Sequence, residues 1–136
     1  MAIFQKFSRI LPSALLGLGL VTVAAPAQAP SLAMLDTLEK GSWELRERSG
    51  GSVVRSFCLG DARAFIQLQH SRGGCSRYVI EDGGAEVTVH YTCPGAGHGR
   101  TTIRRETNRL VQIDTQGISG SAPFSFAYEA RRTGGC

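Results

Sequence analysis

Histidine is the residue type in this chain with the widest chemistry, and there are three, His70, His90 and His98. His98 lies in the glycine-rich stretch 95–99, which predicts an irregular loop, and functional side chains are often carried on loops. An imidazole there would transfer protons or bind a metal if a second titratable group, such as His70 or Glu106, shared a cleft with it. His90 falls on the polar side of an alternating segment, which predicts an exposed surface histidine. One hypothesis is therefore an enzyme or a metal-binding protein centred on His98.

Arginines form the densest cluster of charge, at Arg100, Arg104 and Arg105. Guanidinium groups bind carboxylates and phosphates, so the cluster predicts either an anion-binding face, for a lipid headgroup or a polysaccharide, or an ordinary charged outer face of a sheet. Nucleic acid is not expected as a partner. Without its leader the chain has a net charge of only about +2, and the aromatic residues that would stack on single strands are assigned to the interior.

Apolar side chains that alternate along predicted strands define a candidate ligand-lining interior. Its members are Trp43, Leu45, Phe57, Val89, Tyr91, Phe124, Phe126 and Tyr128, of which Trp43, Tyr91, Phe126 and Tyr128 are the strongest candidates. A curved sheet with such a face would hold a small apolar ligand, or the same side chains would fill the interior themselves. If the first and last strands pair, Trp43 and Phe126 are expected to pack near each other.

Four cysteines, Cys58, Cys75, Cys93 and Cys136, follow an export signal and so predict a disulfide framework. Their spacings of 17, 18 and 43 residues, with no C-x-x-C pair, do not resemble a zinc site. Counting back from Gly84 puts Cys75 opposite Cys93 or within one residue of it, a separation that suits a disulfide. Return of the last strand to the first would bring Cys136 to Cys58. We therefore expect the pairs Cys75–Cys93 and Cys58–Cys136.

An amino-terminal leader precedes the region that contains the cysteines. Lys6 and Arg9 come before an apolar run that ends in A-x-A sites, which is the order of a signal peptide. Pro30 disfavours cleavage after Ala29, so we expect residues 1–27 to be removed. The protein is then predicted to be periplasmic, with no transmembrane anchor after cleavage.

The remaining chain divides into a lead-in segment, residues 28–40, and a single disulfide-stapled β domain, residues 41–136. The lead-in is expected to be loose up to residue 36. Alternation predicts seven strands, at residues 42–48, 53–58, 75–81, 85–92, 100–107, 109–118 and 123–132. Short turns join most of them, so the fold class is mainly β, a curved antiparallel meander that is open or partly closed into a barrel. One short helix is predicted over residues 61–69, capped by Asp61.

Several short landmarks recur in a fixed order along the chain. They are GSWE at residues 41–44, FCL at 57–59, Cys75, YTCPG at 91–95 and RRTGGC at 131–136. Together they resemble the family known as domain of unknown function 3617, small exported proteins of proteobacteria, over nearly all of the chain after the leader. The chain departs from the family after its first strand, where relatives often carry a methionine-rich insertion and Gly50-Gly51 stands here. The family has no established activity, so the resemblance implies a fold and a compartment but no catalytic residues.

Patterns typical of known catalytic sites are missing from the sequence. No G-x-S-x-G nucleophile elbow occurs, and the glycine-rich stretch precedes a predicted strand rather than the helix that a phosphate-binding loop requires. The sequence therefore favours a non-enzymatic binding or envelope-associated protein for a small apolar or anionic ligand, with no cofactor. The enzyme or metal-binding protein centred on His98 is the alternative.

Overall fold

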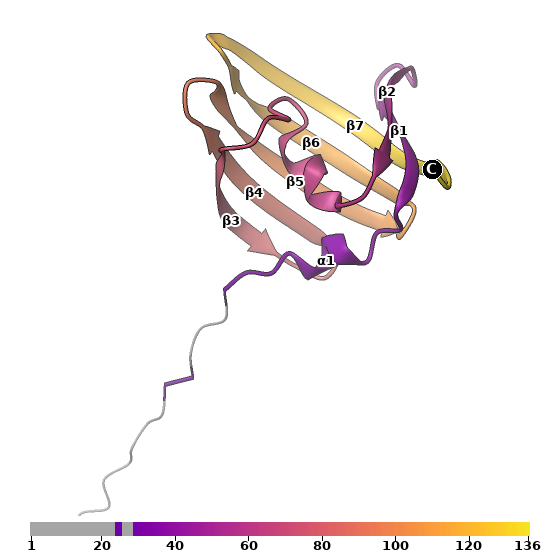
Figure 1. Cartoon of the computed structure of the whole chain (residues 1–136), viewed down its shortest axis with the longest axis horizontal. Coiled ribbons are helices and arrows are strands. Elements are labelled where there is room, and N and C mark those ends of the chain that lie inside the picture. Colours follow the sequence, from indigo (N-terminus) through magenta and orange to yellow (C-terminus); the bar gives the residue numbers. More distant parts are fainter. Residues whose placement is uncertain (1–23, 26–28) are drawn as a thin grey trace, which may run out of the picture.

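The computed structural model describes residues 24–25 and 29–136, so the predicted leader, residues 1–27, lies outside the described residues apart from two positions. One seven-stranded antiparallel sheet dominates it, in the order β2-β1-β7-β6-β5-β4-β3, and it is not closed into a barrel (Figure 1). The strands are β1 (Gly41–Glu47), β2 (Val53–Leu59), β3 (Ser76–Asp82), β4 (Glu86–Cys93), β5 (Gly97–Thr107), β6 (Leu110–Ser119) and β7 (Ala122–Gly134). Two short helices accompany them, α1 (Ala33–Asp36) and η1 (Ala62–Gln67). The predicted mainly β meander is confirmed.

The first and last strands pair, as expected. β1 runs antiparallel to β7, from Ser42 opposite Gly134 to Glu47 opposite Tyr128. The hairpin of β1 and β2 therefore extends the sheet beyond β7, and β2 and β3 remain as its two edges. The central strands β5, β6 and β7 are the longest, and side chains on them are held by hydrogen-bonded neighbours on both sides.

Both expected disulfides are present. Cys58, near the end of β2, joins Cys136 after β7, and Cys75, just before β3, joins Cys93 at the end of β4. Two disulfides indicate an oxidising compartment, such as the periplasm or the cell exterior. Among the described helices, none has the length and apolar character needed to cross a membrane.

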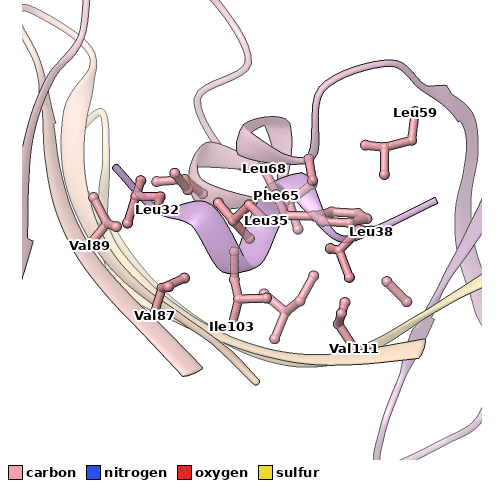
Figure 2. Packing of buried hydrophobic residues seen from close by; sticks show 14 of the residues in the cluster. Leu32, Leu35, Leu38, Leu59, Phe65, Leu68, Val87, Val89, Ile103 and Val111 are labelled. Carbon is pink, nitrogen blue, oxygen red and sulfur yellow. The ribbon is translucent and has the colours of Figure 1, made fainter. Parts of the chain in front are cut away.

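The hydrophobic core lies on the concave face of the curved sheet (Figure 2). Val87, Ile103 and Val111 project from the neighbouring strands β4, β5 and β6. They meet Leu35 from α1 and Phe65 from η1, and all five side chains are buried. The two short helices therefore cover a sheet that is too open to bury its own apolar face.

The segment before β1 is not the loose lead-in that its composition predicts. Leu32, Met34, Leu35 and Leu38 are each at most 6% exposed. The amide of Leu32 also donates to the carboxylate of Asp82 on β3, at 3.2 Å. Burial of these four apolar side chains against the concave face outweighs the cost of ordering the segment, since each contributes about 1.5–3 kcal/mol.

The predicted helix over residues 61–69 is present, but as a six-residue 3₁₀ helix, η1. Asp61 caps it as predicted, because its carboxylate accepts from the backbone N–H of Arg63 at 2.9 Å. Phe65 and Ile66 point from it into the core with no exposed surface. Six residues is long for 3₁₀ geometry, which rarely extends beyond about three or four residues.

The glycine-rich stretch 95–99 is not the irregular loop that its composition predicts. β5 already begins at Gly97, so His98 lies in a strand. Gly99 lies opposite Tyr91 on β4, and a Cβ atom on it would come within 2.6 Å of the Tyr91 hydroxyl oxygen. This glycine therefore marks a close approach inside a sheet, where a bulky ring crosses the neighbouring strand.

Candidate functional site

The four strongest candidates for lining an apolar cavity, Trp43, Tyr91, Phe126 and Tyr128, all lie on the concave face. Trp43 and Tyr91 have no exposed surface, Tyr128 is buried, and Phe126 is half-buried. The Trp43 ring packs edge-to-face against Phe65, with ring centres 5.5 Å apart. Trp43, Tyr91 and Tyr128 thus belong to the hydrophobic core, and Phe126 packs against it.

Trp43 and Phe126 do not meet, although their strands pair. The β1–β7 register puts Trp43 opposite Arg132, six positions along β7 from Phe126. Phe126 stacks instead on Tyr128, with ring centres 5.4 Å apart. The expectation of a Trp43–Phe126 contact was therefore wrong, because alternation fixes the face of a residue but not its register.

His70 is buried at the rim of the concave face, where both of its ring nitrogens are engaged. Nδ1 lies 2.9 Å from the Tyr91 hydroxyl and Nε2 lies 3.1 Å from the carbonyl oxygen of Ala96. A carbonyl oxygen only accepts, so Nε2 carries a hydrogen, and in the neutral ring the Tyr91 hydroxyl then donates to Nδ1. Burial raises the pKa of the Tyr91 hydroxyl. A hollow of about 460 Å³ lies beside His70, but the ring itself serves internal hydrogen bonds.

The three clustered arginines do not share one face. Arg100 and Arg104 lie on the outer face of β5, opposite Gln116 and Gln112 of β6. Arg105 lies opposite the buried Val111, on the other face, as the alternation along β5 requires. Its guanidinium donates to the Thr37 hydroxyl and the Asn108 side chain, both at 3.1 Å, and to the carbonyl of Gly84 at 3.2 Å. Arg105 therefore connects the segment that follows α1 to the sheet by hydrogen bonds. Only Arg100 and Arg104 lie on the outer face.

Two adjoining hollows lie along the outer face of the central strands. The larger has a volume of about 520 Å³ and the smaller about 390 Å³, and they share Arg100, Gln116 and Ser125. We call them together the outer groove. The residues that line the smaller hollow are His90, His98, Arg100, Gln116, Gly117, Ile118, Phe124 and Ser125. Arg100 lies at the junction of the two hollows.

The two ends of the outer groove differ in charge. Glu47 and Asp114 line the larger hollow, and Asp114 is paired with Arg48 at 2.7 Å. The smaller hollow has Arg100 and two imidazoles but no carboxylate among its lining residues. Arg100 forms no ion pair or side-chain hydrogen bond with any residue in the described part of the chain. Its guanidinium is therefore available to a ligand.

His98 is neither alone nor at a loop tip. His90 lies on β4 opposite Arg100, and His98 lies on β5 two positions before Arg100, opposite Thr92. The two imidazole rings lie on the same outer face with their centres 5.7 Å apart. The expected partners of His98 are not beside it. His70 lies at the rim of the concave face and is hydrogen-bonded to Tyr91, and Glu106 accepts a hydrogen bond from Gln112.

Sequence reasoning missed His90, Gln116 and Ser125 as members of the site. Their alternation indicates the outer face of a sheet but does not distinguish a ligand site from an ordinary solvated surface. The register of β4 against β5 is the signal that brings His90 beside Arg100. Composition overstates the length of the turn between these strands, because Gly97 and Gly99 belong to β5.

Comparisons with known proteins identify no relative. No family model matches this chain, and no curated protein or solved structure matches it either.

Proposed function

We propose that this protein is a non-enzymatic periplasmic binding protein, and that the smaller hollow of the outer groove holds a small molecule bearing a carboxylate or phosphate. The observation that carries the proposal is Arg100, a guanidinium in a hollow with no carboxylate partner. An arginine in such a position offers a planar set of N–H donors that matches both anions in two-point contacts.

Hydrogen-bonding groups other than carboxylates surround Arg100 in the smaller hollow. Gln116 lies directly opposite it on β6, and Ser125 lies opposite Gln116 on β7. The imidazoles of His90 and His98 lie on the other side, toward β4. Each of these side chains can donate a hydrogen bond, so an anion would receive several contacts at once.

The scaffold also suits a binding site. The residues that line the smaller hollow come from four adjacent strands, β4, β5, β6 and β7, of one hydrogen-bonded sheet, which holds them in fixed relative positions. A volume of about 390 Å³ falls in the usual range of small-molecule sites, roughly 300–1,000 Å³. Trp43 and Tyr91, two of the candidates for lining an apolar site, have no exposed surface and offer an apolar ligand no contact.

The periplasmic location rests on two features. The predicted leader directs export, and the two disulfides fit the oxidising compartment that export would reach. The resemblance to the family of exported proteins named above points the same way. An anion of that compartment, such as an acidic sugar or a phosphorylated envelope component, is the ligand class we propose.

Calorimetric titration with inorganic phosphate and with citrate tests the proposal, with glucose as the neutral control. We expect Arg100→Gln to weaken anion binding by at least about tenfold, since a hydrogen bond to a charged group is worth roughly 1.5–3 kcal/mol. Arg104→Gln is the matched control, because it removes the same charge from the same strand and face outside the groove. Equal losses of anion affinity in the two variants would mean that the effect comes from net charge and not from a contact with Arg100. Binding that survives Arg100→Gln would refute the site.

A further inference from the structure

We infer that His90 and His98 together form a binding site for a divalent late transition metal of the Zn²⁺ and Cu²⁺ type. The inference comes from the geometry of the two rings and does not depend on the anion proposal. Imidazole is the side chain that these ions bind most readily, through a neutral ring nitrogen. Two imidazoles on one face can act as a chelating pair when their rings lie at the right separation.

The ring separation is close to what one ion requires. Metal–nitrogen bonds of about 2.0–2.1 Å place each ring centre a little over 3 Å from the metal, so two rings at a right or tetrahedral angle on one ion lie about 4.5–5.3 Å apart. The rings of His90 and His98 lie 5.7 Å apart and are tilted by 31° to each other. Binding one ion therefore requires the rings to approach by roughly half an ångström, with a nitrogen of each turned toward the metal.

The backbone holds this arrangement in place. His90 and His98 are diagonal neighbours on β4 and β5, two hydrogen-bonded strands inside the sheet. Diagonal neighbours of this kind are within reach of long or aromatic side chains. His90 is half-buried and His98 is exposed, so an ion from solvent can reach both. Ligand pairs on strands are held more precisely than pairs on loops, so less ordering is needed when a metal binds.

The site would keep open coordination positions. No group of three or more His, Cys, Asp or Glu side chains is placed to hold a metal in the described part of the chain. Two protein ligands therefore leave the remaining positions to water or to an anion, unlike the closed four-ligand sites that zinc uses for structure. We infer an exchangeable metal rather than one on which the fold depends.

Arg100 lies beside the metal site and also carries the anion proposal, so one variant of it distinguishes the two proposals. It lies opposite His90 in the β4–β5 register and lines the same hollow. Its positive charge opposes a metal ion but attracts an anion. Arg100→Gln should therefore weaken anion binding while it leaves metal binding unchanged or makes it tighter.

Calorimetry with Zn²⁺, in buffer free of phosphate and citrate, tests the site on the exported protein. We expect one equivalent of Zn²⁺ to bind. His90→Ala and His98→Ala should each weaken binding by about tenfold or more, since even loss of a group that only supports a ligand costs 10–100-fold. Arg104→Gln is the control that should not change it. Zn²⁺ affinity that is equal in wild type and both histidine variants would overturn the metal site.

Pulsed electron paramagnetic resonance of the Cu²⁺-loaded wild-type protein gives a test that needs no variant. Two coordinated imidazoles are expected, and one or none would overturn the inference. The outcomes separate the two proposals: loss of phosphate binding in Arg100→Gln with no imidazole on Cu²⁺ would leave only the anion site. Two imidazoles on Cu²⁺ with unchanged phosphate binding in Arg100→Gln would leave only the metal site.

Discussion

The two faces of this sheet differ in how their side chains are covered. On the concave face a threonine pair, Thr101 and Thr115, is buried, and the Thr101 hydroxyl also donates to the carbonyl of Ile66 in η1. In the corresponding pair on the outer face, Thr88 is buried, but Thr102 is half-buried and lines the larger hollow. The concave face is therefore filled by the core, whereas the outer face leaves side chains such as Arg100 exposed.

The largest expected difference between the faces concerns their aromatic residues. Trp43→Ala should lower the free energy of unfolding by about 3–5 kcal/mol, because it removes a fully buried ring from the core. Tyr78→Ala, on the outer face and 71% exposed, should change it by less than about 0.5 kcal/mol. Chemical denaturation of both variants measures the contrast, and similar costs would mean that the concave face is not the core.

The threonine pairs provide a matched comparison of smaller size. Thr101→Val should cost about 1–3 kcal/mol, because it leaves the Thr115 hydroxyl and the Ile66 carbonyl without a buried partner. Thr102→Val should cost less, since it removes one hydrogen bond, to the buried Thr88, where Thr101→Val removes two, and since Thr102 itself is only half-buried. The midpoints of denaturant unfolding give the comparison. A larger loss of stability for Thr102→Val than for Thr101→Val would contradict the assignment of the core to the concave face.

The smallest expected effect is a loss of stability at alkaline pH that comes from the concave face alone. Burial raises the pKa of Tyr91 and of Tyr128, so both neutral phenols are favoured in the folded state. Their contribution to stability is fully present below the unfolded value of about 10 and is lost as the pH rises above it. Ultraviolet absorbance of phenolate, followed alongside unfolding, should show these tyrosines ionising late. Complete titration near the ordinary value would show that solvent reaches both rings.

Much of the fold could be predicted because it follows from local patterns. Alternation marked the strands, and hairpin counting paired Cys75 with Cys93. Return of the last strand to the first gave Cys58–Cys136. The strand positions and the disulfide pairs depend on neighbours in sequence or on a single strand pairing, so a short stretch of residues is enough to predict them.

The errors share a different cause, which is register and tertiary packing. The loose lead-in was wrong because Leu35 gains its stability from a concave face that the local sequence does not contain. The predicted contact between Trp43 and Phe126 was wrong because alternation does not determine the register of β7 against β1. The outer groove was missed for the same reason, since Arg100 and His90 are neighbours only through the β4–β5 register.

The position at which an anion binds tests the proposed function most directly. Backbone and side-chain NMR spectra, recorded while inorganic phosphate is added to the isotope-labelled protein, would locate the binding site by the resonances that move. We expect saturable shifts at Arg100, Gln116 and Ser125 on the outer face, with the Trp43 indole N–H unmoved. Shifts at Trp43 and its concave neighbours, with the Arg100 region unchanged, would contradict it.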